Sequence, residues 1–271
     1  STEQDIPLRR ETHFDGRVVL CFRDRPASAH QMFAESVARH PDQQALVGED
    51  GILTYAELED RTARIAGGLM AAGLKKGERV ALLMGNRFAF VEVYLACVRA
   101  GLVCVPMNPR QRAQEIAYAA TQCGAAAIVF EADLAGNIPL GQDIPTVRNI
   151  WAAYGNTAKL GADPYELLLA EAPVAPVDVA EEATAVILYT SGTTGRPKGA
   201  MLTHLGIVHS ALHFAYSMGF QPGDRNLLAV PASHVTGVIA NISTALVKGG
   251  AIIFLGAFKA CDCLALMERE R

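Results

Sequence analysis

Short apolar runs alternate with amphipathic helical stretches along most of this chain, and this alternation constrains its fold more than any other feature. The first predicted strands cover residues 79–84, 102–105 and 126–130. The predicted helices around them cover residues 54–73, 88–100 and 111–122. Strands joined by helical crossovers pair in parallel, and helices then cover both faces of the sheet. The pattern therefore predicts an α/β fold.

Residues at the predicted helix ends support these boundaries. Thr54 and Glu57 have capping-box spacing just before an apolar helical period, and Gly73 follows that helix. Asn86 stands where it could cap the next helix, which Gly101 ends. We therefore expect Asn86 to act as a helix cap.

A second series of strands and helices follows a stretch rich in Gly, Pro and Asp. It has predicted strands at residues 185–189, 226–230 and 251–255, and predicted helices at 203–217, 235–247 and 260–270. The sequence thus predicts two βαβ-type sheet subdomains packed by helices. The expected divisions are an irregular segment at 1–25, a first subdomain with a loop-rich connection at 26–184, and a second, incomplete one at 185–271.

Composition excludes several classes of protein. The net charge of −4 argues against a nucleic-acid partner, which would favour a basic excess. No apolar run reaches the ~18 residues of a membrane helix, and the polar start resembles no signal peptide. Six cysteines without a C-x-x-C pair fit a reducing cytoplasm. His209 and His213 have metal-compatible spacing, but without a supporting motif we predict no metal ligands.

The segment most informative about chemistry follows the strand at residues 185–189. Residues 190–199 contain four hydroxyl side chains, three glycines and one lysine. Glycines allow close backbone approach to a ligand, and hydroxyl and N–H groups donate to anionic oxygens. Ligands bind at the carboxyl ends of strands in open α/β sheets. The segment thus predicts a phosphate-binding loop that is not a Walker A motif, although a Ser/Gly-rich surface loop is the alternative.

Residues 189–199 resemble the signature of the adenylate-forming superfamily, which includes acyl- and aryl-CoA synthetases, luciferases and peptide-synthetase adenylation domains. Residues 53–58 (LTYAEL) and 99–109 resemble two further motifs of that superfamily, in the same order. Residues 231–237 match P-x-x-H-x-x-G, which is similar to a segment of the acid–thiol ligase branch. The resemblance covers residues 25–271 and favours an AMP-forming acyl-CoA synthetase.

The resemblance implies roles for particular residues. The loop would bind the β- and γ-phosphates of ATP through Thr190, Ser191, Gly192, Thr193, Thr194, Gly195 and Lys198. His234 would lie near the carboxylate of the acid, as the one catalytic candidate, and the helix at 235–247 would line a tunnel for the acyl group. The implied cofactors and partners are ATP, Mg²⁺, CoA and a small carboxylic acid. A homodimer is left open.

The later motifs of that superfamily, which bind adenine, ribose and the adenylate, have no match in these 271 residues. The resemblance therefore implies an N-terminal part of such an enzyme, inactive by itself. Two alternatives stay open. One is a non-catalytic nucleotide-binding or scaffold protein, and the other is an adenylation domain of the peptide-synthetase or luciferase-like kind.

Overall fold

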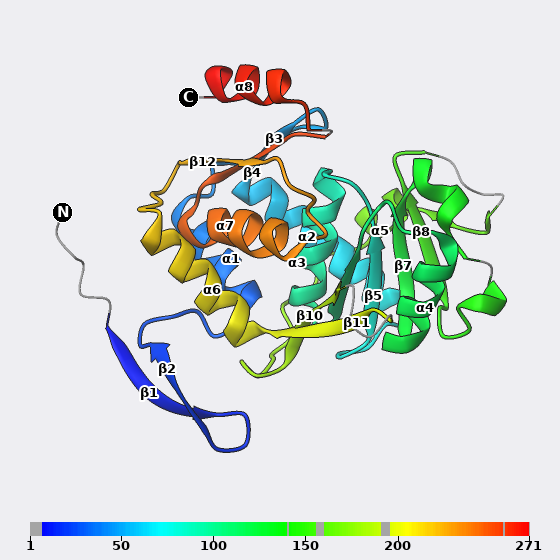
Figure 1. The fold of residues 1–271 in the computed structure, drawn as a ribbon, viewed down its shortest axis with the longest axis horizontal. Helices are drawn as coiled ribbons and strands as arrows, with labels where there is room; N and C mark the ends of the chain where they lie inside the picture. The colour runs from blue at the N-terminus through cyan, green and yellow to red at the C-terminus, as the bar shows by residue number, and fades with distance from the viewer. Residues whose placement is uncertain (1–6, 140, 156–159, 191–195, 257, 271) are drawn as a thin grey trace.

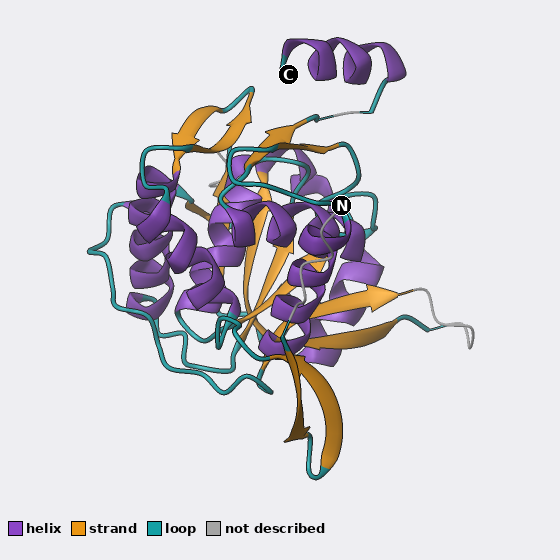
Figure 2. Cartoon of the chain, turned by 90° about the vertical axis from the view of Figure 1, so that its left-hand side faces the viewer, coloured by secondary structure: helices purple, strands orange, loops and turns teal. Residues whose placement is uncertain are grey.

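The computed structural model describes residues 7–139, 141–155, 160–190, 196–256 and 258–270. Within these residues the strands form three sheets, of two, seven and four strands. The seven-stranded sheet lies on the right of Figure 1, and the four-stranded sheet lies at the upper left. Helices pack around both of them (Figure 2). The predicted α/β fold with sheet units packed by helices is confirmed.

The seven-stranded sheet is parallel except at one edge. Its order is β11 (Lys198–Thr203), β10 (Thr184–Thr190), β6 (Val103–Met107), β5 (Arg79–Leu83), β7 (Ala125–Glu131), β8 (Asn149–Ala153) and β9 (Asp163–Pro164). Only β11 runs antiparallel to its neighbour, β10. The parallel strands from β10 to β8 therefore end at one edge of the sheet, the edge where open α/β sheets bind ligands.

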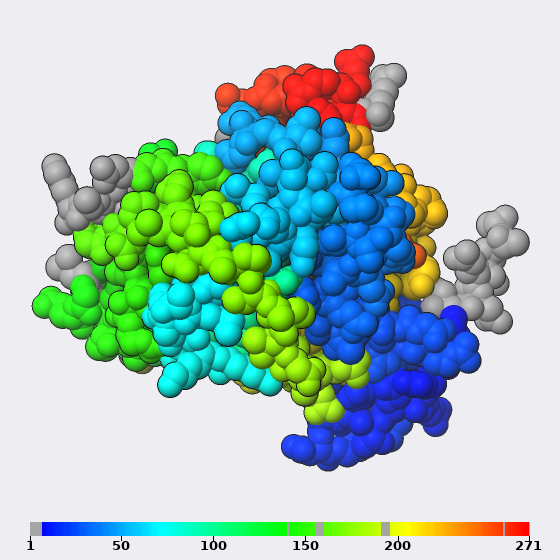
Figure 3. All heavy atoms as spheres, turned by 180° about the vertical axis from the view of Figure 1, so that it is seen from behind, coloured from blue at the N-terminus to red at the C-terminus, as the bar shows by residue number. Residues whose placement is uncertain are grey.

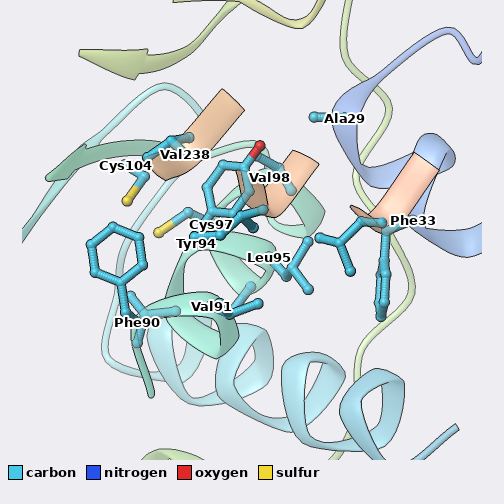
Figure 4. Packing of buried hydrophobic residues seen from close by; sticks show 14 of the residues in the cluster. Ala29, Phe33, Phe90, Val91, Tyr94, Leu95, Cys97, Val98, Cys104 and Val238 are labelled. Atoms are coloured by element: carbon cyan, nitrogen blue, oxygen red, sulfur yellow. The ribbon is translucent and has the colours of Figure 1, made fainter. Parts of the chain in front are cut away.

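Helices cover both faces of this sheet, as the sequence predicts. On one face lie α2 (Tyr55–Ala71) and α3 (Phe88–Arg99), and every residue of α3 is buried. Tyr94 and Leu95 of α3 pack among apolar side chains from several elements (Figure 4). On the other face, α4 (Ala113–Cys123) buries Ile116, Ala119 and Ala120 in a second cluster. The central strands β5, β6 and β7 are therefore buried on both faces.

The four-stranded sheet joins segments from both ends of the chain. Its order is β12 (Arg225–Leu228), β13 (Ala251–Phe254), β3 (Gln44–Gly48) and β4 (Gly51–Thr54). Helix α2, a π-helix η4 (Thr236–Ser243) and α7 (Thr244–Lys248) contact this sheet, and α1 (Ala29–Arg39) and α6 (His204–Ser217) pack against α7. The sheets cross the predicted division at residue 184, because β3 and β4 join the later sheet and β10 and β11 join the earlier one.

The connection between the two halves runs over the surface. It contains the short helices α5 (Glu166–Leu169), η1 (Ala132–Asn137) and η2 (Gly141–Asp143) besides β8 and β9. Its last part crosses the rear face between the cyan and blue regions in Figure 3. There the Val174 and Val177 amides donate to carbonyls of Ala63 and Arg99, at 3.2 and 2.8 Å. These bonds hold the connection against α2 and α3.

The N-terminal segment is not irregular where it is described. Residues 8–22 form an antiparallel hairpin of β1 (Leu8–His13) and β2 (Arg17–Phe22), which projects from the body in Figure 1. The buried guanidinium of Arg25 donates to Glu11 at 2.7 and 2.8 Å and to Glu181 at 2.8 and 2.9 Å. The prediction of an irregular segment is therefore wrong for these residues, because a charge network holds a hairpin there.

Helix α2 begins at the residues that the sequence predicts. The capping box is confirmed: the Thr54 hydroxyl accepts from the Glu57 amide at 3.2 Å, and the Glu57 carboxylate accepts from the Thr54 amide at 2.8 Å.

The last helix, α8 (Ala260–Arg269), buries only Leu266 and stands apart in Figure 2. Within the described residues, none of the helices has the length and apolarity to cross a membrane.

Candidate active site

The predicted phosphate-binding segment connects β10 to β11. Thr190 is the last residue of β10 and Lys198 the first of β11, and the two are paired in register. Both are exposed. The Thr190 hydroxyl lies 3.5 Å from the Lys198 carbonyl oxygen. Ser191, Gly192, Thr193, Thr194 and Gly195 lie outside the described residues. The structure thus places both described ends of the segment at the carboxyl end of β10.

Helix α4 holds both arms of this hairpin. The Tyr189 hydroxyl donates to the Ala119 carbonyl at 3.1 Å and contacts the Gln122 side chain. On the other arm, the Tyr118 hydroxyl donates to the Pro197 carbonyl at 3.2 Å. Burial raises the pKa of Tyr189 above its usual range, so its hydroxyl stays a donor at neutral pH. The sequence did not single out Tyr118, because its contact is made across elements.

A cavity of about 410 Å³ opens where several strand ends meet. Its lining residues come from the carboxyl ends of β6 and β10 and from the segments that follow β6 and β12, and they are Pro106, Asn108, Gln111, Tyr189, Val230, Pro231, Ser233, His234 and Thr236. The structure therefore brings His234 together with Tyr189 from the signature segment and with Asn108 from another of the recognised motifs. Thr190 and Lys198 are outside this lining.

His234 is exposed, and its own contacts determine which ring nitrogen can donate. The backbone N–H of Thr236 lies 3.3 Å from Nδ1, and the Thr236 hydroxyl lies 3.2 Å from it. Because a backbone N–H can only donate, Nδ1 must accept, and in the neutral ring the proton lies on Nε2. His234 can therefore offer an Nε2–H donor to an anionic group.

A second, apolar cavity of about 330 Å³ adjoins the first, since Thr236 lines both. It lies between α6 and η4, and its lining residues are Leu202, Gly206, Ile207, Ser210, Phe214, Val235, Thr236, Ile239 and Ala240. The predicted helix at 235–247 is a π-helix followed by α7. Ile239 of this helix lines the cavity, whereas Val238, Ile242 and Ala245 are core residues.

Asn86 does not cap α3. Arg87 occupies the cap position without a side-chain hydrogen bond, and the Asn86 amide turns instead toward the backbone that leads to His234. The sequence pattern allowed a cap there, but the carbonyls of the second sheet compete for the same side chain. The expectation that Asn86 caps the helix is therefore wrong.

Three further histidines, His204, His209 and His213, contribute to packing. His204 is buried and its Nδ1 accepts from the Ala29 amide at 3.2 Å, while His209 and His213 pack against the Phe22 ring. Among the described residues, one cluster could hold a metal by proximity, namely Glu11, His13 and Cys21. Arg25 already donates to both carboxylate oxygens of Glu11, and burial raises the pKa of the Cys21 thiol. This cluster is an ion-pair network.

The comparison with protein families decides the relationship of this chain. The model of the AMP-binding enzyme family matches residues 33–271. The chain belongs to this family. It is 34% identical over 219 residues to a feruloyl-CoA synthase of Amycolatopsis, covering 81% of this chain and 42% of that protein. It is 31% identical over 245 residues to a long-chain-fatty-acid–CoA ligase of Mycobacterium tuberculosis, covering 89% and 47%.

Solved structures agree with this membership in the AMP-binding family. The apo structure of MbtA from Mycobacterium smegmatis has a TM-score of 0.83 at 27% identity, covering 90% of this chain and 47% of that one. An ATP-bound structure of MatB from Rhodopseudomonas palustris has a TM-score of 0.75 at 30% identity, covering 89% and 48%. The chain spans less than half the length of the feruloyl-CoA synthase and of the fatty-acid ligase that it matches. Its family is that of adenylate-forming acyl-CoA ligases, which use ATP.

Proposed function

We propose that the protein carrying this chain activates a carboxylic acid with ATP as an acyl-adenylate and transfers the acyl group to CoA. One observation supports this most: the base of the signature hairpin and the His234 cavity lie at the same carboxyl edge of the seven-stranded sheet. An anionic acid in the cavity and an anionic nucleotide on the hairpin would thereby be held side by side. Such positioning is the main requirement of this kind of transfer.

The proposed first step joins the acid to the nucleotide. A carboxylate oxygen attacks the α-phosphorus of ATP, the bond from that phosphorus to the bridging oxygen breaks, and pyrophosphate leaves. The Nε2–H of His234 donates to the carboxylate and orients it. Thr190 and Lys198, with Ser191 to Gly195 between them, bind the leaving phosphates. No side chain of the chain needs to act as a nucleophile.

The proposed second step passes the acyl group to CoA. The thiol sulfur attacks the acyl carbon, its proton is lost, and AMP leaves with the former carboxylate oxygen. Magnesium, when bound together with ATP, would supply charge neutralisation in the first step. The lining of the His234 cavity contains no carboxylate, so the described residues there give magnesium no direct anionic ligand.

The acid is proposed to carry an apolar acyl or aryl group. The apolar cavity between α6 and η4 adjoins the position of His234 and is lined mainly by aliphatic and aromatic side chains. A carboxylate at His234 would place its hydrocarbon part in this cavity. A feruloyl-CoA synthase and a long-chain-fatty-acid–CoA ligase among the relatives fit such a substrate class.

The test is acid-dependent exchange of labelled pyrophosphate into ATP, with ferulate, octanoate and palmitate as separate acids. The longest natural protein that contains residues 1–271 should show exchange with at least one acid, and should form the CoA thioester with it. The 271-residue chain alone should bind ATP without exchange. The variant His234→Ala should raise the KM for the acid while the matched exposed-histidine variant His213→Ala does not.

Nucleotide binding without any acid-dependent exchange in the longest protein would favour the non-catalytic alternative. Exchange followed by transfer to a carrier-protein thiol, with CoA inert, would favour an adenylation domain of the peptide-synthetase kind. Robust exchange by the 271-residue chain alone would contradict the proposal that this chain is inactive by itself.

A further inference from the structure

Asn86 connects the two large sheets directly beneath the segment that carries His234. It follows β5 at the carboxyl edge of the seven-stranded sheet and is half-buried. Its neighbours are fixed on both sides. The Gly85 amide donates to Glu131 at 3.1 Å, and the Arg87 guanidinium is paired with Asp50 at 2.6 Å. The Asn86 side chain thus projects from a rigid part of the first sheet.

Both polar atoms of the Asn86 side-chain amide make hydrogen bonds. Its Nδ2 lies 3.1, 3.0 and 3.1 Å from the carbonyl oxygens of Leu228, Val230 and Leu255. Its Oδ1 accepts from the Ala232 amide at 2.8 Å. The carbonyls can only accept and the Ala232 N–H can only donate, so one orientation of the amide fits, with its two N–H groups shared among the three carbonyls. Asparagine is suited to this position because it combines both functions in one short planar group.

The held backbone belongs to the second sheet and to the segment after it. Leu228 ends β12, Leu255 follows β13, and Val230 to Ala232 lead into His234. Pro231 within that stretch has no N–H to donate. The hydrogen bonds of His234 itself among the described residues stay within its own segment, to Pro231, Thr236 and Val238. The segment therefore depends on residues 230–232 for its hydrogen-bonded attachment to the first sheet.

Close packing transmits this attachment to His234. A Cβ on Gly237 would lie 2.3 Å from the Pro231 carbonyl oxygen and 2.7 Å from the Ala232 Cα. Residue 237 thus lies directly against Pro231 and against Ala232, whose amide Asn86 binds. The turn from Ala232 to Gly237, which includes His234, is short, and its two ends pack against each other. A shift at Ala232 would move His234.

We propose that Asn86 is a positioning residue that fixes His234 over the acid-binding cavity by holding the backbone of residues 230–232. This inference rests on the proposed function for its kinetic consequence only. It predicts that the loss of the Asn86 amide acts on the acid through His234, and leaves binding of ATP to the β10–β11 hairpin unchanged.

The structural test observes His234 in the 271-residue chain by NMR. The Cε1–H signal of His234 is identified by its loss in His234→Ala. Asn86→Ala should shift or split that signal, whereas Asn149→Ala should not. Asn149 is the matched control, because it is also half-buried but makes a single bond, 3.3 Å to the Ala72 carbonyl, at the start of β8. An unchanged His234 signal in Asn86→Ala would overturn the proposal.

The kinetic test uses a double-mutant cycle in the longest natural protein that contains the chain. Asn86→Ala should lower kcat/KM for the acid by about tenfold or more, because misplacing a binding group by about 1 Å can cost that much. The Kd of ATP should stay within about twofold. In the His234→Ala background the same change should have little further effect, since coupled residues are not additive. Full additivity would indicate a merely structural role and contradict the proposal.

Two results separate this inference from the proposed function. If the unmutated protein shows no acid-dependent activity, the proposed function fails while the NMR signal still decides the role of Asn86. If Asn86→Ala does not fold, Asn86→Asp keeps the shape and places a carboxylate oxygen against three carbonyls. That variant should show the same displaced His234 signal, and a native signal there would contradict the inference.

Discussion

Buried histidines give single residues a measurable effect on stability. Burial lowers the pKa of His30 and His204 to about 4, and His204 also accepts from the Ala29 amide. Since the unfolded chain binds protons at the ordinary histidine pKa, each residue stabilises the fold fully above about pH 6.5. That contribution is lost as the pH falls toward 4. The buried interface between α1 and α6 is therefore acid-sensitive.

We expect His204→Asn to flatten the pH dependence of stability. The asparagine oxygen can still accept from the Ala29 amide but does not titrate. Between pH 7.5 and 4.5, urea unfolding of the unmodified chain should show a loss of about 2–3 kcal/mol per buried histidine, and the variant should lose one such share less. His213→Asn, at an exposed histidine, is the control. Equal pH slopes for the chain and His204→Asn would argue against this account.

The close approach of neighbouring backbone atoms also explains why residue 237 is a glycine. A methyl group there would collide with backbone atoms of Pro231 and Ala232, which cannot yield as a side chain can. Gly237→Ala should therefore destabilise the chain by about 1–3 kcal/mol. It should also weaken acid binding, because the His234 turn must open. Gly136→Ala has nothing within 4 Å and should change the melting temperature little. Equal melting temperatures for the two variants would refute the explanation.

At the scale of elements, the contact between α4 and the β10–β11 hairpin supports the nucleotide site. Tyr118→Phe removes one hydrogen bond, to the Pro197 carbonyl, at the start of the second arm. A typical hydrogen bond contributes about 1 kcal/mol, so the Kd of ATP should rise by roughly threefold to tenfold. Calorimetric titration of the 271-residue chain with ATP measures this Kd. Tyr216→Phe, in a tyrosine stacked near Lys248, is the control. If the Kd of ATP rises in neither variant, the contact between α4 and the hairpin does not support the nucleotide site.

Local signals predicted those elements whose stabilising contacts are close in sequence. The Thr54–Glu57 capping box lies within one turn, and the apolar strands β5, β6 and β7 are continuous runs. Asp15-Gly16 could have signalled the N-terminal hairpin, since Asp-Gly is a common hairpin turn. Strand β11 was not predicted, because it begins at Lys198, inside the segment that the sequence indicates to be a loop. Asn86 could not be assigned from sequence, because its partners lie over 140 residues away.

At the scale of the whole molecule, the sheets are interleaved along the chain. Strand β3 pairs with β13 beyond residue 250 and with β4 on its other side, and β10 pairs with β6 across about 80 residues. The division predicted at residue 184 rests on local patterns that do not reveal such pairings. Either half alone would therefore leave an unpaired strand edge.

We accordingly expect the chain to unfold in one transition. Trp151, the single tryptophan, reports on the seven-stranded sheet through its fluorescence, and far-ultraviolet circular dichroism reports on all helices and strands. The two urea transitions should coincide, as they do for a cooperative unit. The separate pieces 1–184 and 185–271 should not give native-like spectra. Two resolved transitions, or a folded 185–271 piece, would instead support two separate subdomains divided at residue 184.

The central claim is that an acid and the phosphates of ATP bind side by side at one edge of the seven-stranded sheet. Hydrogen–deuterium exchange of the 271-residue chain, with and without a non-hydrolysable acyl-adenylate mimic bearing an octanoyl or a cinnamoyl group, tests it most directly. The account predicts slower exchange at residues 196–200 and 230–237, with α8 unaffected. Protection confined to residues 113–122 of α4, or to residues 223–227, would contradict it.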